Sequence, residues 1–451
     1  MPSRSDVHYF GAGPAPLPTP VLERASAALL NYQDKGIGLC EMSHRSPEAN
    51  QILADAKAGL TNLLDIPGDD YEILFLQSGG SGEFSAVVYH MVSLWVEKRR
   101  LRAEEEIRTA IADGKVAGEV AKADLQEKVF ERLRREVDEE LRLDYLVTGS
   151  WSLKASQEAA RLVGARHINV SLDARKANDG KFGRIPPETE WSLTPRKREG
   201  GPGSALVYLC DNETVDGVEF PSFPKSLEAH QEDAVDDDAP LVVADMSSNF
   251  ISRRVDVSKY AVIFGGAQKN IGNTGITIVI VRKSLLPPVA KLASPDLLRR
   301  LNLPVGPIVL DWPTIAKNNS LYNTLPIFDV WIAGQVMAGL MQTYGAKRIA
   351  GQEEISNEKA TLLYGVLDKY PNVYHVVPDT SVRSRMNICF RVCGGDAEKE
   401  KAFLAGAEKR GLFGLKGHRS VGGMRASNCN SSFLGISAVQ GYLRCFKVSS
   451  S

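Results

Sequence analysis

The sequence lacks any run of eighteen or more apolar residues, so it offers no candidate for a transmembrane helix. Its first ten residues are polar and lack the apolar stretch of a secretory signal, so we expect no export. The formal net charge is −1, which gives no overall basic field to attract nucleic acid or an anionic membrane. An anionic small molecule would therefore need a local cluster of cations.

Cysteine is also scarce, and the six residues are scattered along 451 positions: Cys40, Cys210, Cys389, Cys393, Cys429 and Cys445. This spacing does not resemble the dense disulfide framework of a short secreted chain. The one close pair has no second pair or histidine cluster to complete a metal site. We expect reduced structural thiols, no metal site and a cytoplasmic protein.

The length predicts more than one domain, and the hydrophobic content of 43% is ordinary for a globular protein. Residues 1–16 are rich in proline and indicate an extended arm. From 17 to 327, short apolar runs alternate with amphipathic helices, which predicts a large α/β domain with a mostly parallel sheet. Residues 328–451 change to long helices and fewer strands, as in a smaller α+β domain.

Residues 97–143 interrupt the large domain with a segment rich in Glu, Arg, Lys, Ala and Leu. Its apolar residues recur three and four positions apart, which is typical of surface helices. We expect a solvated helical hairpin. A surface that binds a partner protein is the alternative interpretation.

Two residues at the ends of predicted strands carry side chains that are suited to hold a cofactor. Lys269 lies among small residues in FGGAQKNIGNTG, where glycines allow close approach of a cofactor to an amine nucleophile. Asp245 ends the apolar run of VVADMSS, and a carboxylate can keep the ring nitrogen of pyridoxal phosphate (PLP) protonated, so the two residues together indicate PLP chemistry. Taken singly, a surface lysine and an aspartate that caps a helix are the commoner explanations.

Two further motifs suit the phosphate and the ring of such a cofactor. In LQSGGSGEF a glycine turn leads into a helix, so Gly80 and Ser81 can offer backbone N–H groups to a phosphate. Trp151 in TGSWS follows a strand and could stack on a flat ring. A common glycine turn and a packing tryptophan are the alternatives.

Five cationic side chains recur in three short motifs: His44 and Arg45 in MSHRS, His418 and Arg419 in KGHRS, and Arg425 in GGMRAS. Arginine binds carboxylates and phosphates through two parallel hydrogen bonds. Three arginines suit a substrate with two anionic groups, although each alone could form a surface ion pair.

Together these motifs give the chain a specific family resemblance. GAGPAPLP, EMSHRS, GGSGEF, TGSWS, DNETVDG, ADMSS, GAQKNIG, YNT and KGHRSVGGMRAS occur in the order found in phosphoserine aminotransferases, class V members of the fold-type I PLP enzymes. The resemblance implies transfer of the amino group of L-glutamate to 3-phosphohydroxypyruvate. The products are O-phospho-L-serine and 2-oxoglutarate, on the route to L-serine.

The resemblance also implies a role for each matching residue. Lys269 would hold PLP as a Schiff base and move protons, Asp245 would pair with the ring nitrogen, and Trp151 would stack. The phosphate or ring oxygen would be bound by Gly80, Ser81, Thr214 and Gln268, and by Asn323 and Thr324 from the other subunit of a homodimer. The substrate anions would be bound by His44, Arg45, His418, Arg419 and Arg425.

The chain departs from the family pattern at four places, and one of them is that YNT continues LP rather than the usual PP. Ser81 stands where some bacterial members have arginine, which weakens the expected phosphate contact. Glu83 stands where the family usually has glutamine, and it adds a negative charge near the phosphate unless its side chain points away. The segment 97–143 is absent from the common pattern.

Two other functions are compatible with parts of the sequence. Another class V transaminase or lyase could act on alanine with glyoxylate, or on serine, but small uncharged side chains need no second anion clamp. A non-catalytic scaffold could bind partners through residues 97–143, yet it would have no need for Lys269 and Asp245. The sequence leaves open whether other phosphorylated keto acids are substrates.

Overall fold

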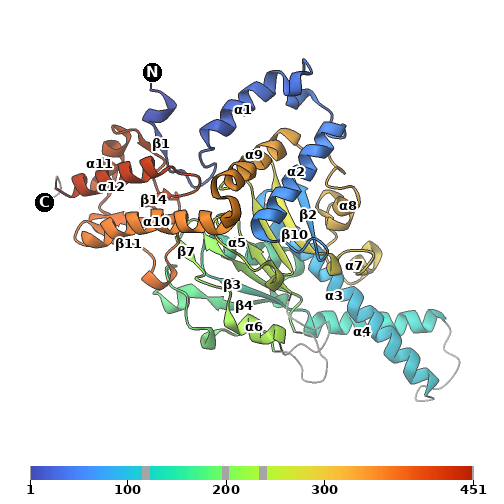
Figure 1. Ribbon diagram of the computed structural model, residues 1–451. Helices are drawn as coiled ribbons and strands as arrows, with labels where there is room; N and C mark the ends of the chain where they lie inside the picture. The colour runs from blue at the N-terminus through green and yellow to red at the C-terminus, as the bar shows by residue number, and fades with distance from the viewer. Residues whose placement is uncertain (1, 114–121, 196–202, 233–240, 449–451) are drawn as a thin grey trace.

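The computed structural model describes residues 2–113, 122–195, 203–232 and 241–448. Its centre is a seven-stranded sheet in the order β2-β10-β9-β8-β5-β3-β4 (Figure 1). The strands are β2 (Tyr71–Leu76), β3 (Leu143–Val147), β4 (Ile168–Asp173), β5 (Val207–Cys210), β8 (Val242–Asp245), β9 (Val262–Gly266) and β10 (Thr277–Arg282). Only β10 runs against its neighbours. The predicted α/β class with a mostly parallel sheet is confirmed.

Both faces of this sheet are buried, because alternate residues of each strand point to opposite cores. In β10, Ile278 and Ile280 belong to one core, whereas Val279 and Val281 belong to the other. The first core is covered by α1 (Thr19–Leu30), α2 (Pro47–Leu64), α6 (Lys225–Glu232) and α9 (Ile327–Tyr344). The second is covered by α3 (Gly79–Ala112), α4 (Lys122–Glu140), α5 (Ser150–Val163), α7 (Pro295–Arg300) and α8 (Trp312–Lys317).

A third core lies in the C-terminal part of the chain, around Phe390 and Phe403. It is built from the antiparallel strands β11 (Tyr374–Val376), β12 (Asn387–Val392) and β14 (Met424–Ser427), and from α10 (Arg348–Lys369), α11 (Ala397–Glu408) and α12 (Phe433–Val448). The N-terminal arm crosses to this part: β1 (His8–Tyr9) pairs with β13 (Leu412–Phe413), and Phe10 is buried in the third core. Helix α9, in contrast, packs on α2 and buries its apolar side chains in the first core.

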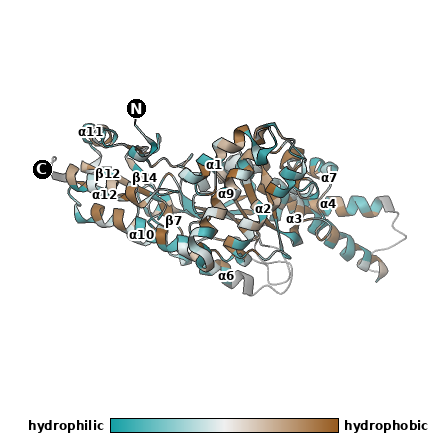
Figure 2. Cartoon of the chain, turned by 45° about the horizontal axis from the view of Figure 1, so that its top comes forward, coloured by the Kyte–Doolittle hydropathy of each residue, from teal (hydrophilic) through white to brown (hydrophobic). Residues whose placement is uncertain are grey.

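The segment 97–143 projects from the body as two helices (Figures 1 and 2). The first is not a separate element, because α3 runs without interruption from the glycine turn to Ala112. Helix α4 returns beside it, and residues 114–121 of the expected hairpin lie outside the described residues. Arginine–glutamate pairs line its surface, such as Arg102 with Glu106 at 2.9 Å. In the part of the chain that the structure describes, no helix is both long and apolar enough to cross a membrane.

Candidate active site

A cavity of about 510 Å³ opens at the carboxyl edge of the central sheet, and this volume is typical of small-molecule sites. In a mostly parallel sheet the loops that follow the strands meet at this edge. The cavity therefore gathers residues that are distant in the sequence. Nine of the predicted site residues line it: Gly80, Ser81, Trp151, Thr214, Asp245, Gln268, Lys269, His418 and Arg425.

Lys269 follows β9 and is buried in the wall of the cavity. Its Nζ donates a hydrogen bond of 2.6 Å to Thr214 Oγ1. Burial lowers the pKa of Lys269, and the nearby Asp245 carboxylate partly opposes this effect. The lowered pKa makes the neutral, nucleophilic amine easier to form than at an exposed lysine.

Asp245 is the last residue of β8 and is also buried. Its Oδ1 accepts hydrogen bonds from the backbone N–H of Ser247 at 2.9 Å and from Ser247 Oγ at 2.6 Å. No other described residue makes a hydrogen bond to this carboxyl, so Oδ2 stays available to a group in the cavity. Burial raises the pKa of Asp245, whereas the two bonds from Ser247 lower it. Ser247 was not predicted as a site residue, although a serine two positions after an aspartate is a common signal for such a turn.

The glycine turn joins β2 to α3, with Gly79 in the left-handed region at φ +63°. Gly79, Gly80 and Ser81 line the cavity, so the N-terminus of α3 faces it with its unpaired backbone N–H groups. Ser78 lines the cavity as well. This end of the cavity is suited to a phosphate.

Glu83 does not line the cavity but points away from it. Its Oε1 accepts a hydrogen bond of 2.5 Å from Ser78 Oγ, and its Oε2 accepts one of 3.2 Å from Trp312 Nε1. The side chain is fully buried, and burial raises its pKa to about 7. The negative charge that the sequence placed near the phosphate is therefore behind the turn and partly neutralised.

Trp151 lies in the first turn of α5, and its side chain lines the cavity. The buried Glu213 fixes that turn: its Oε2 accepts from Trp151 N at 2.8 Å and its Oε1 from Ser152 N at 2.9 Å. Burial raises the pKa of Glu213 to about 8. Asp216 Oδ2 accepts from Ser150 N at 2.7 Å. These two carboxyls lie within the DNETVDG motif, in which only Thr214 was predicted to be a site residue.

Arg425 and His418 bring positive charge to the cavity from the C-terminal part of the chain. Arg425 Nη1 donates to the backbone oxygen of Thr214 at 3.1 Å, and its buried Nε has no hydrogen-bond partner among the described residues. His418 Nδ1 lies 2.6 Å from Ser420 Oγ. Burial first, and then the nearby cations, lower the pKa of His418. An unpaired guanidinium N–H in a cavity wall is suited to bind an anion.

The other five predicted residues lie outside the cavity of a single chain. Arg45 is exposed, and its Nη2 lies 3.4 Å from the backbone oxygen of Leu321. Asn323 is exposed and donates from Nδ2 to Gln77 Oε1 at 2.9 Å, just before the glycine turn. The remaining three are His44, which is partly buried, and Thr324 and Arg419, which are exposed.

The N-terminal arm also contributes to the cavity, and this contribution was not predicted from the sequence. Ala12 and Gly13 line it, and Ala15 N donates to the backbone oxygen of Gln268 at 2.8 Å. Gly13 has φ +134°, a conformation that favours glycine. Both residues lie in the motif GAGPAPLP, which the sequence offered only as part of the family resemblance. Within the described ranges, no cluster of three or more His, Cys, Asp or Glu could hold a metal ion.

Comparisons with known proteins agree with this geometry. The chain matches the family model described as aminotransferase class-V over residues 7–112 and 134–433. It is 40% identical over 439 residues to a phosphoserine aminotransferase of Saccharomyces cerevisiae, covering 97% of this chain and 95% of the yeast protein. The unmatched residues 113–133 fall within the segment 97–143.

Solved structures give the same result. The phosphoserine aminotransferase from Bacillus circulans subsp. alkalophilus superposes with a TM-score of 0.75 at 31% identity, covering 98% of each chain. The PLP-bound phosphoserine aminotransferase from Trichomonas vaginalis gives a TM-score of 0.73 at 29% identity, covering 97% of this chain and 99% of that one. These likenesses confirm the predicted fold-type I architecture.

Proposed function

The chain belongs to the class V aminotransferases and, within them, to the phosphoserine aminotransferases, and we propose that it transfers the amino group of L-glutamate to 3-phosphohydroxypyruvate. The products are 2-oxoglutarate and O-phospho-L-serine, an intermediate in L-serine biosynthesis. The observation that carries the proposal is the meeting of Lys269, Asp245 and Arg425 in one cavity.

The residues present fit pyridoxal 5′-phosphate. The amine of Lys269, the available oxygen of Asp245 and the ring of Trp151 would hold the aldehyde, the ring nitrogen and the ring face. The glycine turn at the N-terminus of α3 would hold the phosphate, with Gly80, Ser81, Thr214 and Gln268 as further contacts. When bound, PLP accepts the electron pair left on the substrate α-carbon.

Lys269 performs the proton transfers in this proposal. Its amine takes the proton from the α-carbon of the amino acid and returns one when the keto acid is converted. The hydrogen bond to Thr214 orients Nζ, and the lowered pKa of Lys269 favours the neutral amine, which is the form that acts as a base. The Asp245 carboxylate keeps a proton on the ring nitrogen, which maintains the electron-accepting character of the ring.

Substrate recognition rests on the cations of the cavity wall. Glutamate carries two carboxylates, and 3-phosphohydroxypyruvate carries a carboxylate and a phosphate, so one site must hold two anionic groups in either substrate. Arg425, with its unpaired Nε, and His418 lie in the wall. The other cations predicted to bind substrate are His44, Arg45 and Arg419, which lie outside the cavity of a single chain.

The active form in this proposal is a homodimer. Asn323 lies beside Gln77 at the start of the glycine turn, and it is exposed together with Thr324. Nearby apolar side chains are also exposed, including Ile308 and Val309. A second copy packed on this face would cover them and bring Asn323 and Thr324 of the partner subunit to the phosphate. Sedimentation velocity checks the dimer, and a purely monomeric active enzyme would contradict it.

The cytosol is the compartment that we propose for this protein. All six cysteines are free, as expected in a reducing environment. Fractionation of cells followed by immunodetection would test the assignment.

The test of function is a coupled assay with glutamate and 3-phosphohydroxypyruvate. We expect robust turnover by the wild type and little turnover with hydroxypyruvate, which lacks the phosphate. Arg425→Ala should keep bound PLP but lose affinity for the phosphorylated substrate. Arg161→Ala, which removes an exposed arginine paired with Glu158, is the matched control. A wild-type protein with bound PLP but no turnover would overturn the substrate assignment.

A further inference from the structure

Glu83 occupies an unusual place behind the glycine turn. It is a fully buried carboxyl, and its two hydrogen-bond partners, Ser78 and Trp312, come from different elements. Ser78 also lines the cavity in which the proposed function places the phosphate of PLP. Glu83 therefore touches a residue that faces the cofactor without touching the cofactor itself.

The hydrogen bond between Ser78 and Glu83 determines what Ser78 can offer to the cavity. A hydroxyl has one proton to donate. When Glu83 is ionised, that proton is committed to Oε1, and the short distance of 2.5 Å is typical of a bond to a carboxylate. Ser78 then presents only lone pairs toward an anion, and the negative charge of Glu83 lies directly behind it.

Adding one proton to Glu83 reverses this arrangement without moving a heavy atom. The protonated Oε1 donates to Ser78 Oγ, and the hydroxyl proton of Ser78 is released to donate into the cavity. Oε2 continues to accept the N–H of Trp312. The buried charge disappears at the same time, so repulsion of a phosphate disappears with it.

We propose that Glu83 is a positioning residue that controls the affinity of the glycine turn for the cofactor phosphate, strengthening it when protonated and weakening it when ionised. This inference rests on the proposed function, because it takes the phosphate of PLP as the anion bound at the turn.

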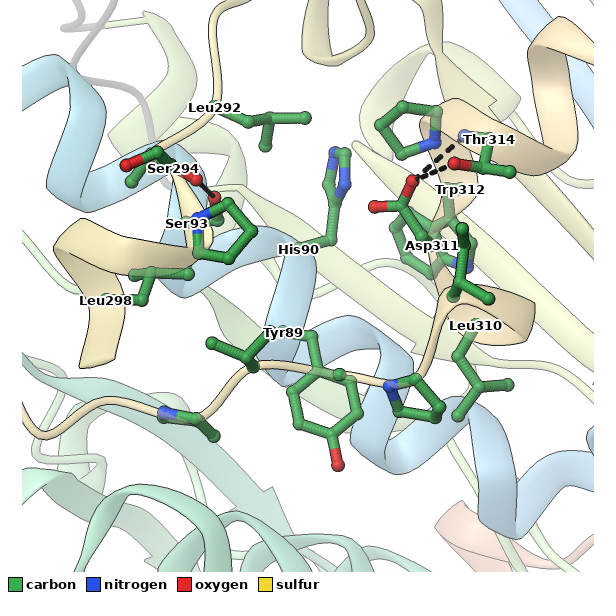
Figure 3. Close-up of a pocket in the computed structure, with 18 residues that line it drawn as sticks. Tyr89, His90, Ser93, Leu292, Ser294, Leu298, Leu310, Asp311, Trp312 and Thr314 are labelled. Carbon is green, nitrogen blue, oxygen red and sulfur yellow. Dashed lines mark hydrogen bonds between the residues drawn. The ribbon is translucent and has the colours of Figure 1, made fainter.

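The surroundings of Glu83 support titration in the working pH range. Burial raises its pKa to about 7, and only the bonds from Ser78 and Trp312 oppose that shift. The ring of His90 lies against the ring of Trp312, with centroids 4.8 Å apart and ring planes tilted by 39°, in the wall of a second cavity (Figure 3). Burial lowers the pKa of His90 to about 4, so this ring is neutral where Glu83 titrates. Asp311, the neighbour of Trp312, is engaged as the cap of α8.

The sign of the pH dependence follows from linkage. Because phosphate favours the protonated carboxyl, phosphate binding raises the pKa of Glu83 and takes up protons. Affinity for PLP is then highest below pH 7 and falls as the pH rises through 7. A donor to a charged group commonly changes affinity by about tenfold or more.

The experiment compares wild type with Glu83→Gln, titrating the apoenzyme with PLP by fluorescence between about pH 6 and pH 8.5. The glutamine amide donates to Ser78 permanently, so it mimics the protonated carboxyl. We expect the wild-type Kd for PLP to rise about tenfold more across this range than that of the variant. PLP and Lys269 also titrate, but they do so in both proteins, and the difference isolates Glu83.

Two controls and one calorimetric measurement separate this inference from a merely structural role. Pyridoxal, which lacks the phosphate, should bind both proteins with the same pH dependence. In a Ser78→Ala background, Glu83→Gln should lose the part of its effect that is transmitted by the hydroxyl. Calorimetry in buffers of different ionisation enthalpy should show extra proton uptake near pH 8 in the wild type only.

Parallel pH dependences for wild type and Glu83→Gln would overturn the inference while leaving the proposed function intact. Failure of the wild-type apoenzyme to bind PLP at any pH would overturn both. If Glu83→Gln does not fold, Ser78→Ala alone tests the inference. This variant should weaken PLP binding at low pH more than at high pH, because only the protonated Glu83 releases the Ser78 hydroxyl to the phosphate. An equal loss at both pH values would contradict the mechanism.

Discussion

Two cavities of similar size lie along the N-terminal half of α3, and they differ in the residues that line them. The cavity at the carboxyl edge of the sheet, of about 510 Å³, gathers Lys269, Asp245 and Arg425 from three distant segments. The second, of about 440 Å³, lies between α3 and residues 292–314 (Figure 3). Its wall is rich in proline and leucine, and its buried histidine, His90, is bonded to the backbone. Volume does not distinguish them, whereas convergence of unpaired polar groups does.

The protonation states of the two linings differ for the same physical reason. Burial disfavours charge in both. In the first cavity opposite charges and hydrogen bonds partly compensate, so Asp245 and Lys269 act on each other. In the second, His90 gains a bond to the backbone oxygen of Leu285 and the attraction of Asp311, but burial outweighs both and the ring stays neutral. Buried ionisable groups whose charge is stabilised by a nearby partner are typical of active sites.

The largest expected effect is that of Lys269→Ala, which should reduce turnover by more than about 10⁴-fold because no other amine replaces it. Mass spectrometry after borohydride reduction should find the cofactor attached to the wild type and not to the variant. Lys291→Ala, at an exposed position, should retain both activity and attachment. Full turnover by Lys269→Ala would end the proposal that this cavity is catalytic.

Asp245→Asn should have the next largest effect, because an amide cannot keep the ring nitrogen protonated. We expect kcat to fall on the order of 10²–10³-fold, as when one preorganised electrostatic contact is removed. The two hydrogen bonds from Ser247 can remain, so thermal stability should change little. Steady-state kinetics beside a melting curve checks this, and an unchanged kcat would contradict the role of Asp245.

Arg425→Lys should have a smaller effect, which falls mainly on KM. Lysine keeps the charge but loses the paired N–H groups that bind a carboxylate or phosphate. We expect KM for both keto acids to rise about tenfold, with kcat reduced less. Should KM stay constant while kcat falls, Arg425 would act on the chemistry rather than on binding.

His90→Phe, in the second cavity, should change kcat/KM least, within about twofold, because His90 touches no part of the first cavity. Its effect should appear in stability. The folded-state pKa of about 4 lies below the ordinary value of 6.5, so protons favour the unfolded chain and stability falls as the pH drops below 6.5.

Removing His90 should therefore flatten the acid side of the stability curve. Between pH 7 and pH 5 the wild type should lose about 2 kcal/mol of unfolding free energy more than His90→Phe. Urea titrations of both proteins at these pH values measure the difference. Equal losses would show that His90 can be protonated inside the fold.

Much of the site could be predicted because strand ends are visible in the sequence. The apolar runs before Asp245 and Lys269 are short and end in small or polar residues, so both residues were placed correctly at the carboxyl ends of β8 and β9. The glycine turn before α3 was also predicted correctly, because its glycines separate an apolar run from a helical pattern. The extent of α3 was not, because a helix that continues as charged surface has no stop signal at residue 97.

The positions of Glu213 and Glu83 could not be predicted. Both are ionisable residues in short motifs, and the commoner location of such residues is the surface. Only the tertiary structure shows Glu213 under the first turn of α5 and Glu83 between Ser78 and Trp312. Trp312 lies 229 positions from Glu83, a separation that no local pattern can span.

The sequence by itself determined the α/β architecture, the strand ends that carry Lys269 and Asp245, and the cationic motifs, because these depend on local periodicity and residue type. The tertiary structure decided which cations face the cavity, which carboxyls are buried and which of them can hold a proton. Those properties depend on desolvation and on partners from distant segments. In a single chain it therefore brought Arg425 and His418 to the cavity and left Arg45 and Arg419 outside.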